Sequence, residues 1–482
     1  MPAVTNRRLI PTGLQDARHR ELLQLTDGDM EIQQASAWQP VVRRGLVVAS
    51  ASSLESYYNQ TSELPEFVHA PSKTAVKERL RNRLVRNDPE LWKASPEAKV
   101  QALVDFDKGY LPTEEALRFT VSLVASYVDC MRSRDIHNPR YRRYFYSFKE
   151  ALQGRGPVPS RESLETLTGV SYILAGSVHQ CRTTYIQRLR NLFGEPFRVE
   201  GPSLNDINAV WYFPIVVLRW PTCGTLKGLL EQFRDRLVSE LKDPADTGPI
   251  LKRVRGRNAP SALIAASVLL NVGMLVVDGA LAESLGGELR DILAFLGDLQ
   301  SYANIPVLLS CSDAFLNGAE KLGSKVENVL RGRMLVFEPL ARPAAGASKR
   351  GLWHQHNQWL WSAGLLPPML EMPCDLPSWT WEICLGRVDW LVDGFRALHE
   401  RLAWEPSLLI NGGPSRDVVV EAFKHRLRIL TAPRSFIKEY DNKSKSLQRN
   451  DLLQHVDYLP FNDIAELLNV RQRPARLGVE YA

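Results

Sequence analysis

The segment Gly176-Ser-Val-His-Gln-Cys-Arg-Thr183 decides how this chain of 482 residues is interpreted, because it has the frame of a phosphate-binding loop. Such a loop has a glycine, four residues, and then glycine, lysine and serine or threonine, between a buried strand and a helix. Gly176 and Thr183 keep their places, whereas Cys181 replaces the second glycine and Arg182 replaces the lysine. The frame predicts a nucleotide-binding fold, and the two replacements predict a degenerate site.

The residues on either side of the loop fit this interpretation. Residues 170–175 are a short apolar run with β-branched and aromatic side chains, which predicts a strand, and residues 183–193 repeat apolar side chains at helical spacing. In a working loop, backbone N–H groups and the helix N-terminus hold the phosphates, and the threonine hydroxyl holds Mg²⁺. ATP and Mg²⁺ are therefore the candidate ligands. The predicted nucleotide contacts in this segment are Gly176, Cys181, Arg182, Thr183 and Thr184.

The two replacements predict weak ATP binding. Cys181 puts a side chain where glycine lets the backbone approach a phosphate closely. Arg182 brings a broad planar guanidinium where a compact ammonium normally fits between phosphates. A match of this length also arises by chance, so the interpretation depends on the segments downstream of the loop.

A second apolar run, residues 272–277, ends in Asp278 and Gly279. This pattern is typical of a central parallel strand with an acid at its carboxyl end, where phosphate-loop NTPases place an aspartate that helps to hold Mg²⁺. Gly279 stands where a glutamate would polarise the attacking water, and Glu283 could replace it only if the next loop folded back. The alternative is that Asp278 only caps the strand end.

The order of the elements favours the nucleotide fold. Apolar runs that predict strands alternate with segments that predict helices, which indicates a parallel sheet covered on both faces. Ligands of such sheets bind at the carboxyl ends of the strands, where Gly176, Asp278 and Ser310 would all lie. After the first strand and helix, the predicted elements are a strand at 212–220, a helix at 226–241, a strand at 272–278, a helix at 285–299 and a strand at 305–312.

Several short segments in one order make the chain similar to TnsC-type AAA+ regulators of bacterial DNA transposition, which are related to the TniB proteins. The resemblance covers roughly residues 115 to 430. It implies an α/β core of the phosphate-loop AAA+ type with a parallel sheet, a C-terminal helical lid and a mixed helical N-terminal extension. The matching segments outside the loop are residues 131–139, 221–228, 305–311, 353–361 and 381–389.

The resemblance also implies partners and a division of the chain. Such regulators form rings or filaments on double-stranded DNA and link a target-selection protein to transposase subunits, with ATP controlling assembly. The replacements at Cys181, Arg182 and Gly279 fall on binding and hydrolysis, so a non-hydrolysing scaffold, or a partner of an active paralogue, is expected. The implied parts are an N-terminal extension for targeting-partner or DNA contact at 1–115, the core at 116–345, the lid at 346–432 and a tail at 433–482 for transposase docking.

The net charge of +6 is concentrated in two basic clusters. Such stripes neutralise DNA phosphates and give sequence-independent, salt-sensitive binding; a solvated helix face or an acidic protein partner is the alternative. Arg331 and Arg333 fall where one subunit could present arginine to its neighbour's nucleotide, or could serve as ordinary surface residues. The predicted DNA contacts are Lys73, Lys77, Arg79, Arg81 and Arg83 in the first cluster and Arg132, Arg134, Arg140, Arg142 and Arg143 in the second.

Composition excludes several classes of protein. With 44% hydrophobic and 24% charged residues the chain is expected to be soluble and globular, with no membrane partner. Residues 1–8 lack the apolar core of a signal peptide, so a cytoplasmic, bacterial protein is expected. Two other functions stay open: an active ATPase of the same family, and a signalling or defence module with the same fold and no DNA role.

Overall fold

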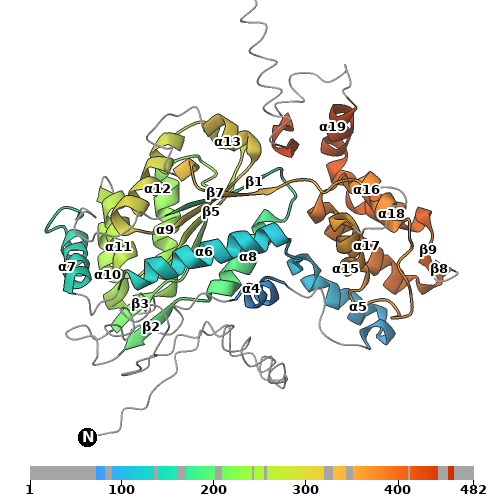
Figure 1. Cartoon of the computed structure of the whole chain (residues 1–482), viewed down its shortest axis with the longest axis horizontal. Coiled ribbons are helices and arrows are strands. Elements are labelled where there is room, and N and C mark those ends of the chain that lie inside the picture. Colours follow the sequence, from blue (N-terminus) through green and yellow to red (C-terminus); the bar gives the residue numbers. More distant parts are fainter. Residues whose placement is uncertain are drawn as a thin grey trace, which may run out of the picture.

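The computed structural model describes two packed parts, an α/β core and a helical domain (Figure 1). The described residues are 72–81, 90–134, 139–159, 170–200, 209–241, 244–254, 258–319, 329–343, 351–410, 413–442 and 454–460. Three parts of the predictions lie outside the described residues. These are residues 1–71 of the predicted N-terminal extension, Arg83 of the first basic cluster and residues 461–482 of the predicted tail.

A five-stranded parallel sheet forms the centre of the core. Its strands lie in the order β4-β5-β6-β1-β7, and every neighbouring pair is parallel. Because parallel neighbours require crossover connections, helical structure lies between each strand of this sheet and the next one along the chain. The strands are β1 (Ser171–Gly176), β4 (Val216–Arg219), β5 (Leu275–Ala280), β6 (Val307–Cys311) and β7 (Arg333–Phe337).

Helices cover this sheet in two groups and close one continuous apolar cluster with it. In the first group α4 (Lys73–Leu80) packs on α6 (Glu114–Arg132) and α8 (Arg182–Phe193), and side chains of α6 and α8 also contact each other. In the second, α9 (Leu226–Glu240), α11 (Ala259–Leu269) and α12 (Leu289–Ala303) pack together, with α7 (Pro139–Gln153) and α10 (Pro244–Arg253) outside α11. The predicted α/β core with a parallel sheet is confirmed.

Two local features differ from the sequence predictions. The strand predicted at 212–220 is two strands: β3 (Ala209–Tyr212) pairs antiparallel with β2 (Phe197–Glu200), and β4 joins the main sheet. Pro214 lies between them and lacks the N–H that a continuous ladder needs. β7 was not predicted, because its apolar run, residues 334–337, is short and this edge strand is partly exposed.

The helical domain follows β7 and contains its own apolar cluster. Its helices are α15 (Leu352–Trp361), α16 (Leu376–Cys384), α17 (Val388–Trp404), α18 (Arg416–Arg426) and α19 (Thr431–Asp441). The cluster also takes in Leu91, Leu103 and Phe106, since α5 (Pro96–Ala102) and the turn η4 (Leu103–Lys108) pack on α17 (Figure 1). It also includes Phe436 and Leu459, so the helical cluster extends beyond 346–432 at both ends.

Hydrogen bonds tie the segment after β7 to the helical domain. The Leu340 N–H donates to the Gly386 carbonyl over 2.9 Å, and the Trp381 indole N–H donates to the Leu340 carbonyl over 2.9 Å. Gly386 has a φ of +75°, and a Cβ there would lie 2.4 Å from the Leu340 oxygen, so only glycine fits. This junction places the start of α17 beside the sheet.

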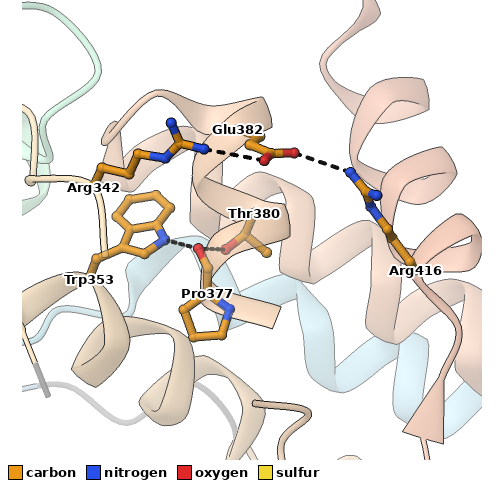
Figure 2. A network of polar contacts seen from close by, with 6 residues as sticks. All are labelled: Arg342, Trp353, Pro377, Thr380, Glu382 and Arg416. Carbon is orange, nitrogen blue, oxygen red and sulfur yellow. Dashed lines mark hydrogen bonds and ion pairs between the residues drawn. The ribbon is translucent and has the colours of Figure 1, made fainter. Parts of the chain in front are cut away.

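Polar contacts around α16 support the same junction (Figure 2). Glu382 receives hydrogen bonds from Arg342, in the linker, and from Arg416, on α18. These three side chains are exposed, so their ion pairs contribute little stability. The buried indole N–H of Trp353 donates to the Pro377 carbonyl over 2.8 Å and joins α15 to α16.

None of the described helices combines the length and apolar character needed to cross a membrane. Within the same residues, no group of three or more His, Cys, Asp or Glu side chains is placed to hold a metal ion.

Candidate nucleotide site at the carboxyl edge of the sheet

The loop between β1 and α8 has the backbone of a tight turn that normally requires glycines. At Gly176 a Cβ would lie 2.3 Å from the Phe337 carbonyl oxygen, so the neighbouring strand β7 excludes any side chain. His179 and Cys181 both have left-handed backbones, with φ of +63° and +60°. A side chain in that conformation costs roughly 1 kcal/mol, so the backbone at Cys181 is one that favours glycine, as the motif predicts.

Thr183 and Asp278 meet at this edge. The Thr183 hydroxyl, in the first turn of α8, donates to the Asp278 carboxylate, in β5, over 2.9 Å between Oγ1 and Oδ2. Thr183 is exposed and Asp278 is half-buried. Hydroxyl and carboxylate oxygens are ligands that Mg²⁺ accepts, so this pair fits the predicted metal position.

The position after Asp278 carries no catalytic carboxylate. Gly279 is exposed and has a φ of +93°, and the β5–β6 register shifts there between Asp278 and Ala280. Glu283 lies in the exposed turn η8 (Ala282–Leu285). Ser310 faces Asp278 across the β5–β6 ladder, and its buried hydroxyl has no hydrogen-bond partner among the described residues.

Arg182 carries a buried donor without a partner. The residue is 9% exposed, and its Nη1 atom finds no hydrogen-bond acceptor in the part of the chain that the structure describes. Its charge reaches Cys311 at the end of β6, where it opposes the burial that raises the pKa of that thiol to about 12. A buried cationic nitrogen that lacks an acceptor fits an anion such as a phosphate.

Residues 454–460 cross this edge and bind three of its loops. The Val178 N–H donates to the Asp457 carbonyl, and the Ala282 N–H donates to the Asp457 carboxylate, each over 2.9 Å. The Ser312 hydroxyl donates to the same carboxylate oxygen. Asp457 therefore touches the loops that follow β1, β5 and β6.

The start of α17 covers the loop as well. The Cys181 thiol donates to the Asp389 carboxylate over 2.7 Å, and the Asp389 N–H donates to the His179 carbonyl over 3.3 Å. The His179 ring packs against Trp390 and Tyr458, with ring centres 5.6 and 5.8 Å away, and these two rings also contact each other. Burial raises the pKa of the Cys181 thiol, to which the Asp389 charge adds, and burial lowers the pKa of His179.

The sequence patterns identified Thr183, Asp278 and Ser310. They did not predict that residues 454–460 and the start of α17 cover the loop between β1 and α8. Asp457 is a single carboxylate in a polar segment, with no motif around it. Asp389 lies in a segment that resembles the start of the family's lid helix, which was the one available signal.

The second basic cluster requires a correction. Arg134, predicted to contact DNA, is 3% exposed, and its Nη1 and Nη2 atoms donate to the carbonyls of Val272 and Ala303 over 2.7 Å each. A guanidinium used in this way is a structural donor inside the core and does not reach a DNA phosphate. Most aromatic side chains of α7 are buried as well, and only Tyr146 is exposed; the buried ones are Tyr141, Tyr144, Phe145 and Phe148.

The other basic residues differ in exposure. Arg79 is half-buried, and desolvation lowers its pKa to about 10, while Lys73 forms an ion pair with Glu114. The exposed or half-buried residues that fit the predicted DNA contacts are Lys77, Arg81, Arg142 and Arg143. The structure does not describe the side chains of Arg132 and Arg140.

The two predicted interface arginines lie at the amino ends of the strands, opposite the candidate nucleotide site. Arg333 begins β7 and pairs with Tyr172, near the start of β1, and its guanidinium donates to the Ser122 hydroxyl. Arg331 is exposed beside it. Their role between subunits stays a prediction.

Comparison with known proteins gives limited information. No family model matches the chain, and no curated protein matches it. The chain is similar to a solved structure of the ORC2 protein of Aeropyrum pernix, in ADPNP and ADP complexes, with 14% identity, 66% of this chain and 79% of that chain covered, and a TM-score of 0.36. The fold assignment rests on the strand order and on the loop between β1 and α8.

Proposed function

We propose that this chain is an AAA+ regulator of DNA transposition that assembles on double-stranded DNA, links target selection to transposase and hydrolyses ATP weakly or not at all. The carrying observation is the contact of 2.9 Å between Thr183 and Asp278 at the carboxyl edge, next to a glycine at 279. This contact supports a retained metal position, whereas the position that would activate water has no side chain.

The described residues suit a nucleotide in part. Thr183 and Asp278 would hold Mg²⁺, and the loop backbone with Arg182 would hold phosphate oxygens. The ion would neutralise phosphate charge. Without a carboxylate at 279 no group in this position orients the attacking water, so binding without turnover is the expected behaviour.

The placement of the matching segments supports the transposition part of the proposal. Residues 221–228 follow β4 and lead into α9, where the Thr225 hydroxyl caps the helix by accepting from the Gly228 N–H over 3.2 Å. Residues 353–361 lie in α15, and residues 381–389 span the end of α16 and the start of α17. The positions of these three segments support the proposal.

Binding to duplex DNA at several salt concentrations tests the DNA role. We expect a steep loss of affinity with salt that persists without nucleotide, since the binding energy comes from counterion release. Because each phosphate contact contributes a slope of about 1, the Arg142→Ala/Arg143→Ala variant should lower the slope by up to about 2. Arg134→Lys is a poor probe, since Arg134 is a core residue.

Two further measurements accompany this titration. Electron microscopy of the protein with duplex DNA should show rings or filaments. Phosphate release should equal that of the Thr183→Ala/Asp278→Ala variant. Duplex binding that is weak and indifferent to Arg142 and Arg143 would instead favour a signalling or defence module, and release above the control would favour an active ATPase.

A further inference from the structure

We infer that residues 454–460 are a built-in occupant of the nucleotide site, and that ATP and this segment bind the phosphate side in a mutually exclusive way. This inference rests on the proposed function, because it takes the loop between β1 and α8 as the phosphate site. It adds a regulatory element that belongs to the chain itself.

Asp457 lies where a nucleotide would be expected. Its partners are Val178, Ala282 and Ser312, which follow β1, β5 and β6 respectively. The carboxyl ends of these three adjacent strands form the edge at which a parallel sheet binds its ligand. A single residue from a distant part of the chain thus takes donors from all three loops.

The chemistry of the Asp457 contacts resembles that of a bound phosphate. Asp457 presents a carboxylate oxygen to one backbone N–H and one hydroxyl, and its carbonyl to another backbone N–H. An anionic oxygen that accepts from loop N–H groups and a hydroxyl makes the same type of contact that a phosphate oxygen makes in such a loop. Nucleotide phosphates and Asp457 would therefore compete for the same donors.

The helical domain holds the segment from the other side. Arg387, at the start of α17 and 1% exposed, donates from Nη2 to the Tyr458 carbonyl over 2.6 Å. Leu459 is buried in the helical cluster, and the His455 ring packs on Phe436 with ring centres 5.1 Å apart. The segment joins the helical domain to the sheet edge, so its release would also loosen the cover over the loop.

The segment leaves the metal position open. Among the described residues, no hydrogen bond joins 454–460 to Thr183 or Asp278, and Thr183 is exposed. The metal position is thus accessible while the phosphate side is covered. Weak nucleotide binding by the intact chain would then have a removable cause, in addition to the replacements at Cys181 and Arg182.

The test compares full-length protein with the Asp457→Ala and Asp457→Asn variants, using Mg²⁺ with ATPγS as the probe. We expect Asp457→Ala to bind ATPγS about tenfold more tightly or better, because two hydrogen bonds to an ionised group disappear from the competing state. Asp457→Asn keeps an acceptor oxygen and should remain closer to the wild type. Thr183→Ala added to Asp457→Ala should remove the gain.

Amide hydrogen exchange gives an independent measurement on the same proteins. Asp457→Ala should increase exchange in peptides covering residues 171–185, and saturating Mg²⁺ with ATPγS should increase exchange at 454–460 of the wild type, since coupling between two ligands is reciprocal. Both changes are absent if the segment is only a structural support.

Affinity equal to that of the wild type, both in Asp457→Ala and in Asp457→Ala/Tyr458→Ala, would overturn the inference. If all these proteins bind ATPγS equally, the occupant is rejected and the proposed function stands. If none binds it, the nucleotide site is rejected as well. Duplex binding of the same variants, which should not change, shows whether the DNA role survives either result.

Discussion

The metal side and the phosphate side of the candidate site differ in how accessible they are to a ligand. On the metal side, Thr183 and Asp278 are accessible and lie 2.9 Å apart. On the phosphate side, the Val178 N–H donates to Asp457 and the Cys181 thiol donates to Asp389 at the start of α17, so the chain itself covers part of this side. The frame of the site therefore persists, and access to its phosphate side is what the chain restricts.

One replacement in the motif takes part in that restriction. The Cys181 side chain stands at the second glycine position and donates to Asp389 of α17, a contact that glycine could not make. Such a residue changes the site twice, since it occupies space near the phosphates and helps to hold the helical domain against the loop. The sequence alone shows only the first effect.

Acid should produce the largest difference between the two sides. His399 lies in α17 and is fully buried; its Nε2 contacts the Leu360 carbonyl, its Nδ1 has no hydrogen-bond partner among the described residues, and burial lowers its pKa to about 4. The unfolded chain takes up this proton first, so stability is complete above about pH 6.5 and is lost as pH falls through 4. The full loss corresponds to about 3 kcal/mol.

Hydrogen exchange and thermal unfolding between pH 7 and 4 check this expectation. The helical domain and residues 176–182 should become less protected, whereas β5 near Asp278 should not. His399→Phe should reduce the pH dependence of the stability. A smaller pH dependence should remain, because burial also lowers the pKa of His356. Equal loss of protection on the two sides would remove the distinction between them.

Asp278→Ala tests the metal side. We expect binding of ATPγS to weaken about tenfold in the presence of Mg²⁺ and to stay the same in EDTA, since the variant removes one anionic ligand of the ion. Glu283→Ala, in the exposed turn after β5, is the matched control and should behave as the wild type. A control that weakens binding as strongly would assign Glu283 a role in the site.

Arg182→Met tests the phosphate side without a ligand. Removing a buried donor that has no partner among the described residues should stabilise the fold by about 1 kcal/mol, because the desolvation cost of that donor disappears. Urea unfolding measures the change, with Arg182→Lys as the control that keeps a buried charge. A strongly destabilised Arg182→Met variant would mean that the guanidinium already has a structural anion partner.

Cys181→Gly should have the smallest effect on stability. The change relieves a left-handed backbone, which is worth about 1 kcal/mol, and removes the contact with Asp389, so the two effects nearly cancel. Exchange at residues 176–182 should nevertheless increase, since one contact of the cover is gone. Unchanged exchange would show that Cys181 does not hold α17 in place.

Sequence patterns predicted the parts of the fold that are local or continuous. β1, β5 and β6 are buried apolar runs, and their order in the sequence predicts that Thr183 lies near Asp278, as the hydrogen bond between them shows. β7 was not predicted, because its apolar run of residues 334–337 is short and lies in a partly exposed edge strand.

The sequence could not predict which segments cover the loop between β1 and α8, or which basic side chains are buried. Ser312 and Asp457 are 145 residues apart, and no spacing rule joins a carboxylate in a polar segment to a distant loop. Arg134 was predicted to contact DNA because the residue type indicates a positive charge but does not indicate whether the side chain is buried. Tertiary contacts decide both points.

A structure of the Asp457→Ala variant with Mg²⁺ and ATPγS would test the central claim most directly. We expect the ion at Thr183 and Asp278, the phosphates against residues 176–183, and residues 454–460 moved off the loops after β1, β5 and β6. Nucleotide bound elsewhere, or bound at this loop with residues 454–460 still in place, would contradict the claim.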